Sequence, residues 1–186
     1  MGDIRRTRKK YQKPSHPWQI ARLEEEKPLF KEYGLKNKTE LWKMNSIAKS
    51  IAIQAKKLIA KRNDSQAQKE KERLLSKLIR YKLIQPGDQI EAALGLTSRD
   101  ILERRLQTQV LRKNLARTIK QARQLVTHGH IKVNKRVITS PSHLISADDV
   151  IEYAENSPFS SEQHPERPDK KIVEVLEKQE QNGAKK

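Results

Sequence analysis

The chain has 186 residues, with 40 lysines and arginines against 23 aspartates and glutamates, so its formal net charge is +17. A charge of this size on a short chain indicates a polyanionic partner, for which nucleic acid is the leading candidate. Only 34% of the residues are hydrophobic and no apolar run exceeds three residues, which excludes a transmembrane span and a signal-peptide core. Cysteine is absent, which excludes disulfides and thiolate metal sites and agrees with a reducing, intracellular compartment.

Residues 1–17 carry a dense positive charge and show no apolar periodicity. They contain a single acid, Asp3, and we predict that they form a basic arm that binds nucleic acid. A terminus that only adds solubility is the alternative. Trp18, which follows two prolines, either anchors the arm on the body or stacks on a base. The arm cations predicted to bind are Arg5, Arg6, Arg8, Lys9 and Lys10.

Residues 18–98 are predicted to form a helical domain. Three helices are expected before residue 84, with interruptions at Pro28, Gly34 and Asn63–Asp64. The middle helix starts with a capping sequence, in which Asn37 is followed three residues later by Glu40. A turn at residues 85–88 and a short apolar segment follow. The apolar stripe of the middle helix consists of Leu41, Met44, Ala48, Ile51, Ala55, Leu58 and Ile59.

Residues 99–154 are predicted to form two short helices followed by a small, twisted antiparallel sheet. Helix-capping sequences at Thr97 and Thr118 start one helix that reaches about Lys113 and a second one that Gly129 ends. Alternating apolar residues from residue 131 then predict strands joined by a turn at Asn134–Lys135. Further short strands are expected at residues 144–145 and 150–153. The fold class is therefore α+β.

The last segment, residues 155–186, differs in composition from the rest. It contains six basic and seven acidic residues and three prolines, so the positive field belongs to the body of the chain. We predict a C-terminal tail. Its apolar residues form either a short docking helix or part of a disordered terminus, and these residues are Ile172, Val173, Val175 and Leu176.

The positive charge is most concentrated between Arg99 and His143. This stretch holds eleven basic residues against two acidic ones. On the two predicted helices the cations lie off the apolar stripes, so packing of the stripes turns them outward onto a shared surface. Arginine suits such a surface because its planar guanidinium binds two phosphate oxygens and also stacks on a base.

This basic stretch resembles the alpha-L RNA-binding motif, which residues 99–146 match nearly continuously. The motif also occurs in RNA-modifying enzymes and a tRNA synthetase, so the resemblance alone implies RNA binding and no particular host protein. The features that carry it are Arg105-Leu106, Arg112-Lys113, Ala116-Arg117-Thr118, the run Gln121 to Val126 and the run His128 to Asn134.

The chain as a whole resembles the fourth small-subunit ribosomal protein family, most closely its archaeal and eukaryotic branch. The resemblance covers residues 1 to about 154. It implies direct binding to small-subunit ribosomal RNA, nucleation of subunit assembly, contact with small-subunit protein five and a role in translational accuracy. It also implies a cytoplasmic location in the small ribosomal subunit, with no membrane contact and no independent homo-oligomer. The segments that carry it are Ser15-His16-Pro17-Trp18, Leu35-Lys36-Asn37-Lys38, Glu40-Leu41-Trp42 and Leu94-Gly95-Leu96 leading into Leu102 to Thr108.

We therefore predict an RNA-binding surface, no catalytic residues, no cofactor and no metal. Besides the arm cations and Trp18, the residues predicted to bind RNA are Arg104, Arg105, Arg112, Lys113, Arg117, Lys120, Gln121, Arg123, Gln124, His128, His130, Lys132, Asn134, Lys135 and Arg136.

The chain departs from the family pattern at two turns. Asn114 stands where the family often has glycine, and because asparagine tolerates the left-handed conformation, the helix end should be kept. Lys135 stands where the hairpin usually has glycine. Lysine is disfavoured at positive φ, so a turn other than type I′ is expected. The N-terminal cysteines through which bacterial relatives hold zinc are absent, so that site is not expected here.

Other chemistry has weaker support in the sequence. His128 and His130 do not share one helical face and have no carboxylate cluster beside them, which disfavours a metal site. Asp148 and Asp149 are adjacent, so on a strand they would point to opposite faces. We predict that the chain is not an enzyme. The alternatives are an RNA chaperone and an RNA-modifying factor that use the same RNA-binding motif.

Overall fold

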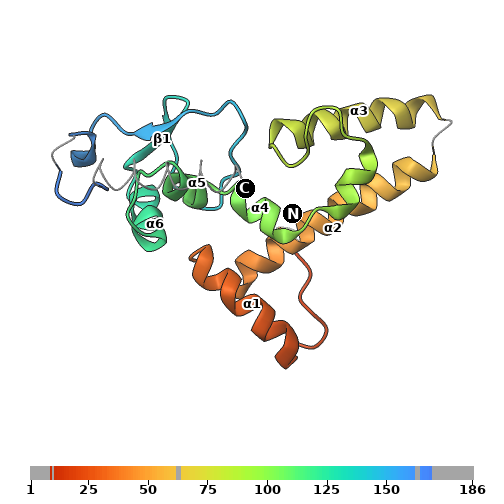
Figure 1. The fold of residues 1–186 in the computed structure, drawn as a ribbon, viewed down its shortest axis with the longest axis horizontal. Coiled ribbons are helices and arrows are strands. Elements are labelled where there is room, and N and C mark those ends of the chain that lie inside the picture. Colours follow the sequence, from red (N-terminus) through yellow and green to blue (C-terminus); the bar gives the residue numbers. More distant parts are fainter. Residues whose placement is uncertain (1–8, 10, 62–63, 162–163, 169–186) are drawn as a thin grey trace, which may run out of the picture. The chain divides into compact units, whose positions relative to one another are not determined.

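The computed structural model describes residues 9, 11–61, 64–161 and 164–168. The chain divides into two compact units, Met1–Leu102 and Glu103–Lys186. We call them the helical unit and the C-terminal unit. The predicted α+β class is confirmed, because helices are followed by a small antiparallel sheet (Figure 1). Among the described residues, no helix combines the length and the apolar character needed to cross a membrane.

The helical unit contains the three predicted helices, α1 (Ile20–Glu32), α2 (Lys38–Ala60) and α3 (Ser65–Arg80), followed by the short 3₁₀ helix η1 (Ile90–Gly95) and by α4 (Ser98–Glu103). The side chain of Asp64 accepts a hydrogen bond from the amide of Gln66 and so caps α3. One side of α2 packs against α3 and η1, as its apolar stripe predicted. The buried residues of this cluster are Ala55, Leu74, Leu78, Ile84, Ile90 and Ala93.

One expected helix boundary was wrong, and one expected cap stands at the predicted residue without its side-chain hydrogen bond. Pro28 lies inside α1 and does not interrupt it. Proline removes its own backbone donor and crowds the carbonyl group four residues earlier, but the helix continues beyond it, as shown by the hydrogen bond from the amide of Tyr33 to the carbonyl oxygen of Leu29 at 3.0 Å. Asn37 is the N-cap residue of α2, but its side chain makes no capping hydrogen bond.

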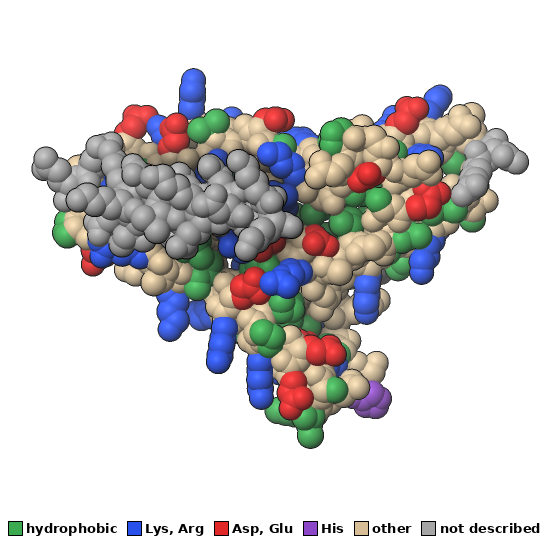
Figure 2. All heavy atoms as spheres, viewed as in Figure 1, with side chains coloured by type: hydrophobic (Ala, Val, Ile, Leu, Met, Phe, Trp, Pro, Cys, Tyr) green, Lys and Arg blue, Asp and Glu red, His purple; other side chains and the backbone are tan. Residues whose placement is uncertain are grey.

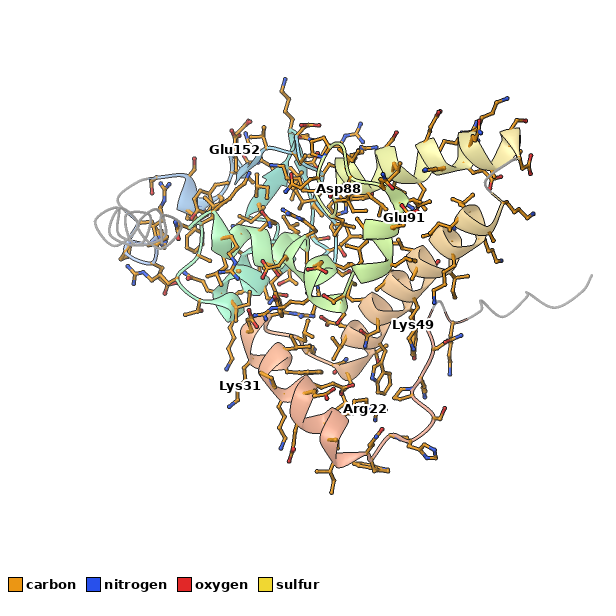
Figure 3. All side chains as sticks on the ribbon, turned by 45° about the vertical axis from the view of Figure 1, so that its right-hand side comes forward. Arg22, Lys31, Lys49, Asp88, Glu91 and Glu152 are labelled. Atoms are coloured by element: carbon orange, nitrogen blue, oxygen red, sulfur yellow. The ribbon has the colours of Figure 1, made fainter. Side chains whose placement is uncertain are left out.

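The end of the predicted arm is tied to the helices by polar and aromatic contacts. Tyr11 stacks on Trp42, with ring centroids 6.4 Å apart, and Arg22 donates to the carbonyl oxygens of His16 and Pro17 at 2.8 Å each. Figure 3 shows Arg22 on α1. Trp18 is 84% exposed. It therefore does not anchor the arm, and base stacking by Trp18 stays a prediction.

The C-terminal unit contains α5 (Leu106–Arg112), α6 (Ile119–Thr127), a three-stranded sheet and the 3₁₀ helix η2 (Pro158–Ser160). Its strands are β1 (Ile131–Val133), β2 (Arg136–Val137) and β3 (Ile151–Tyr153), arranged in the order β2-β1-β3 with both pairs antiparallel. The core joins both helices to the sheet. Its buried residues are Leu106, Val110, Ala116, Ala122, Leu125, Val126, Ile131, Val133, Ile145 and Ile151.

The helix predicted from Thr97 to Lys113 is two helices, because the backbone between them pairs with a distant segment. Arg105 forms an isolated antiparallel bridge with Leu144. The amide of Leu106 donates to the carbonyl oxygen of His143 at 2.7 Å, and the amide of Ile145 donates to the carbonyl oxygen of Arg104 at 2.9 Å. These bonds replace helical ones and separate α4 from α5. Residues 144–145, which were predicted to form a strand, make this bridge and do not join the sheet.

The hairpin turn between β1 and β2 also differs from the prediction. Asn134 and Lys135 have φ values of 48° and 68°, and a type I′ turn requires positive φ at both of these positions. The side chain of Asn134 holds the turn, because its Nδ2 donates to Asp149 Oδ1 at 2.6 Å and its Oδ1 accepts from the amide of Val150 at 2.9 Å. The expectation of a different turn was therefore wrong.

The ends of α5 and α6 agree with their predicted caps. Asn114 has a φ of 54° and Gly129 a φ of 76°. After each of them the chain makes the longer backbone hydrogen bond of a Schellman motif. The amide of Leu115 donates to the carbonyl oxygen of Val110 at 3.0 Å, and the amide of His130 donates to that of Leu125 at 2.9 Å. These two ends set the direction in which the chain leaves each helix.

Candidate nucleic-acid interface

The start of α6 is fixed by reciprocal side-chain capping. Thr118 Oγ1 accepts a hydrogen bond from the amide of Gln121 at 3.2 Å, and Gln121 Oε1 accepts one from the amide of Arg117 at 2.7 Å. The predicted capping sequence is confirmed. Because these bonds fix the backbone, Arg117 and Gln121 project from a defined helix end, with Lys120 exposed between them in the sequence.

Further along α6, Arg123 is half-buried and is held by a glutamine from the neighbouring helix. Its Nη1 lies 3.4 Å from Oε1 of Gln107, whose own Nε2 donates to the carbonyl oxygen of Ile119 at 3.1 Å. Gln107 is 1% exposed. A buried amide therefore joins α5 to α6 and limits the positions that the Arg123 guanidinium can take. Gln124, on the same helix, is exposed.

The end of α5 carries an exposed pair of cations, Arg112 and Lys113. Arg112 Nη2 lies 3.1 Å from Glu103 Oε1, and its Nε lies 3.4 Å from the other carboxylate oxygen. This two-point contact orients the guanidinium plane on the surface.

The hairpin presents its cations in two different settings. Lys135 and Arg136 are exposed at and beside the turn. Lys132 lies between two glutamates, with its Nζ 3.3 Å from Glu152 Oε2 and 3.3 Å from Glu155 Oε1. The hydrogen bonds to Glu155 and Glu152 raise the pKa of Lys132, so its ammonium is charged at neutral pH, but its charge is already compensated. Lys135 and Arg136 therefore carry the net positive charge of the hairpin.

The two histidines lie where α6 ends and β1 begins. His128 is the C-cap residue of α6, and its ring stacks on that of His130 with centroids 6.3 Å apart. His130 Nδ1 lies 3.0 Å from Ser157 Oγ. Within the described parts of the chain, no three histidine, aspartate or glutamate side chains are grouped as a metal site requires. The histidines border a shallow hollow of about 400 Å³ that also touches Lys132, Lys135, Val137 and Asn156.

Several residues that were predicted to bind RNA lie in the protein interior, in the helical unit or outside the described residues. Arg105 is 1% exposed, so its guanidinium belongs to the protein interior and offers no surface to a ligand in this structure. Arg104 is half-buried, whereas Lys9 and Trp18 are exposed and belong to the helical unit. The remaining arm cations lie outside the described residues, as do the apolar residues of the tail. These arm cations are Arg5, Arg6, Arg8 and Lys10.

The sequence reasoning missed the role of the end of β3 and of the segment that follows it. Tyr153 donates from its hydroxyl to the carbonyl oxygen of Leu115 at 2.5 Å, and Phe159 packs on the core of the C-terminal unit. Burial raises the pKa of Tyr153, and the nearby Arg167 opposes this effect. Residues 164–168, which we call the C-terminal strap, contact the start of α6. The sequence signal for this role was the presence of two aromatic residues, Tyr153 and Phe159, in a chain with only 4% aromatic residues.

The exposed cations of the C-terminal unit gather on three of its elements: the end of α5, the start of α6 and the hairpin. Figure 2 shows lysine and arginine side chains extending from the visible surface, interspersed with acidic ones. Each of the three elements is fixed by a cap, a Schellman motif or a side-chain clamp. Cations held at fixed positions suit a negatively charged ligand of defined shape.

Comparison with known proteins agrees with this arrangement. Residues 104–151 match the family model of the S4 domain. The chain is 48% identical to the small ribosomal subunit protein uS4 of Thermoplasma acidophilum, over 90% of this chain and 86% of that protein. It is 49% identical to the uS4 proteins of Picrophilus torridus and Methanococcus maripaludis, over 90% of this chain and 93% and 95% of those proteins. At this identity over nearly the whole length, the chain belongs to the small ribosomal subunit protein uS4 family.

Proposed function

We propose that the protein is a structural constituent of the small ribosomal subunit and binds its ribosomal RNA directly through the C-terminal unit. The observation that carries this proposal is the placement of exposed cations on elements with a fixed backbone. The relatives are named as proteins of the small ribosomal subunit, which supports the same role. The exposed cations proposed to contact RNA are Lys113, Lys120, Lys135 and Arg136, together with Arg112, which Glu103 orients, and with Arg117, Gln121, Arg123, Gln124, His128 and Asn134 beside them.

The proposed mechanism combines charge and shape. Lysine and arginine side chains displace the counterions condensed on RNA, and this release contributes affinity without reading sequence. The helix ends and the hairpin hold these charges at set positions, so they match a particular path of the RNA backbone. Selectivity is therefore for the folded form of the RNA. The buried Arg105 contributes to the packing of the unit and not to RNA contact.

The same RNA-binding surface supports a more specific proposal, a role in subunit assembly and in translational accuracy. A protein that recognises folded RNA by its backbone can bind before the other proteins assemble, and we propose that this one nucleates assembly of the subunit body. We also propose that it contacts small-subunit protein five and through this contact contributes to translational accuracy. Cytoplasmic ribosomes are the expected location. No catalytic step is proposed, in agreement with the ribosomal relatives.

Retention on native small subunits tests this proposal. Small subunits purified from cells are washed with increasing salt, and the protein is quantified against a core ribosomal protein. One copy per subunit after the wash is expected. Substoichiometric and exchangeable association would instead support the RNA chaperone, and RNA modification by the purified chain would support the modifying factor.

The counterion mechanism has its own test. The affinity of the purified protein for a small-subunit ribosomal RNA transcript is measured between about 50 and 200 mM salt, a range over which six to ten phosphate contacts would lower it by about 10³ to 10⁵. A steep loss of affinity is expected. Binding that does not change with salt would contradict the electrostatic mechanism.

A further inference from the structure

The C-terminal strap covers the two polar side chains at the start of α6. Arg117 donates through Nη2 to the carbonyl oxygen of Pro165 at 2.6 Å and through Nε to that of Arg167 at 3.0 Å. Gln121 donates through Nε2 to the carbonyl oxygen of Glu166 at 2.9 Å. Three consecutive backbone oxygens are thus bound by two side chains whose backbone the helix cap holds in place.

This row of oxygens has the hydrogen-bonding character of an RNA backbone. Phosphate oxygens are acceptors like carbonyl oxygens, but they also carry negative charge, so a guanidinium binds them more strongly. The edge of Arg117 formed by Nε and Nη2 cannot donate to the strap and to a phosphate at the same time. The strap and an RNA backbone therefore compete for the same edge of Arg117 and for the amide of Gln121.

Apart from the hydrogen bonds from Arg117 and Gln121, which an RNA backbone would replace, the strap is held by contacts that are individually weak. The guanidinium of Arg167 lies 4.9 Å from the ring centroid of Tyr153, and the ring of His164 lies 4.3 Å from that of Phe159. Pro165 and Glu166 are exposed. Cation–π and ring contacts at a partly exposed surface contribute little individually. The strap can consequently leave α6 while the core of the unit stays folded.

The strap also brings an acidic side chain to a surface that is otherwise basic. Glu166 is exposed between the two residues whose carbonyl oxygens bind Arg117. Its carboxylate repels a phosphate that approaches the start of α6. The backbone of the strap and the carboxylate of Glu166 therefore oppose RNA at this position, whereas the guanidinium of Arg167 lies over the Tyr153 ring.

We propose that the C-terminal strap is an autoinhibitory contact, which occupies the start of α6 in the free protein and is displaced there by the phosphate backbone of RNA. This inference rests on the proposed RNA-binding function and adds a regulatory step to it. Only the fraction of molecules with a released strap binds RNA fully, so the apparent Kd equals the intrinsic Kd divided by that fraction. Loosening the strap strengthens RNA binding.

The variant Arg167→Ala tests whether loosening the strap strengthens or weakens RNA binding. It removes the contact with Tyr153 and also one positive charge, which by itself would weaken RNA binding. We expect instead about threefold tighter binding to a small-subunit ribosomal RNA transcript, because the population with a released strap increases. Fluorescence anisotropy with labelled RNA measures the affinity, and thermal unfolding by circular dichroism shows whether the variant is folded.

Two further variants serve as controls for Arg167→Ala. Arg80→Ala removes the same charge from an exposed position on α3, in the helical unit, and is expected to leave the affinity unchanged or slightly weaker. His164→Ala removes the ring contact with Phe159 without a change of charge in its neutral form, and is expected to tighten binding as Arg167→Ala does. Unchanged or weaker binding in both strap variants would overturn the proposal.

A spin label detects the displacement directly. Because the chain has no cysteine, Glu166→Cys provides a single attachment site on the exposed part of the strap. We expect the electron paramagnetic resonance spectrum to narrow when the RNA transcript is added, because the released strap moves faster. A spectrum that stays unchanged or broadens while RNA binds would overturn the proposal. If the unlabelled wild-type protein binds no RNA at all, the proposed function fails first, so the two failures are distinguishable.

Discussion

The helical unit and the C-terminal unit carry their positive charge in different ways. Lysines such as Lys43, Lys49 and Lys56 stand exposed along α2, opposite its buried stripe. In the C-terminal unit the cations stand at helix ends and at a hairpin, and Arg112 and Arg123 are oriented by partners. Net charge and charge placement are therefore separate properties of the chain. The first attracts any polyanion, whereas the second selects one shape of polyanion.

Truncation of a core side chain in the C-terminal unit should cause the greatest loss of stability and should distinguish this unit from the helical unit. Leu106→Ala removes a fully buried side chain from the C-terminal unit and should lower the free energy of unfolding of that unit by about 2–5 kcal/mol. Binding to the ribosomal RNA transcript should weaken with it, because the RNA surface depends on this fold. Hydrogen exchange, resolved by segment, measures the loss of protection in each unit.

Leu78→Ala provides the matched variant in the helical unit, where Leu78 is 1% exposed. It should reduce protection in the helical unit by a similar amount and affect RNA affinity less than Leu106→Ala does. Equal losses of RNA affinity in the two variants would remove the functional contrast between the units.

The side-chain hydrogen bonds of Asn134 that hold the hairpin turn should have the next largest effect on stability. Asn134→Ala removes the side-chain hydrogen bonds to Asp149 and to the amide of Val150 and should destabilise the C-terminal unit by about 1–3 kcal/mol, at about 0.5–1.5 kcal/mol for each bond. Asn37→Ala should change stability by less than about 0.5 kcal/mol, because Asn37 makes no side-chain capping bond. Chemical denaturation measures both, and a large effect at Asn37 would show that the two asparagines are equivalent.

The same hairpin shows where sequence reasoning reaches its limit. The three helices of the helical unit, the stripe on α2, the caps at Thr118 and Gly129 and the α+β class follow from local patterns, and all were predicted. The type I′ turn was not predicted, because lysine at positive φ is disfavoured locally. The clamp that holds the turn comes from Asp149 and Val150, which are distant in sequence.

Backbone pairing between segments distant in sequence accounts for the other differences between the predicted and the observed structure. The apolar spacing from Leu102 to Val110 is continuous, so it predicts one helix, and only the bridge between Arg105 and Leu144 divides it. The same bridge lies at the buried Arg105, which local pattern had placed on the RNA surface. Cations of the hairpin and of α6 were predicted at exposed positions, and most of them are exposed. Burial of a single arginine depends on tertiary pairing that a local pattern does not encode.

A smaller effect tests charge placement directly. Arg136→Gln should weaken RNA binding about tenfold and lower the slope of affinity against salt by about one phosphate contact. Lys49→Gln removes one charge from the exposed face of α2 (Figure 3) and should change the affinity less than about twofold, since this charge adds only to the general field. Titration of both variants at several salt concentrations checks the contrast. Similar slopes and affinities would indicate that only the total charge matters.

The smallest effect uses two lysines that adopt positive φ, Lys82 at 50° after α3 and Lys135 at 68° in the hairpin. A left-handed conformation costs an L-residue about 1–2 kcal/mol, and glycine avoids this cost but loses about 0.5–1 kcal/mol more chain entropy on folding. Lys82→Gly and Lys135→Gly should therefore each stabilise their unit by about 0.5–1 kcal/mol, as measured by chemical denaturation.

The two glycine variants should differ in RNA binding. Lys135→Gly should weaken it although the fold becomes more stable, because the exposed ammonium at the hairpin tip is part of the proposed surface. Lys82→Gly should change RNA binding less, because Lys82 lies in the helical unit and outside the proposed surface. A Lys135→Gly variant that is more stable and binds RNA as well as the wild type would remove the hairpin tip from the interface. The RNA would then be bound by α5 and α6 alone.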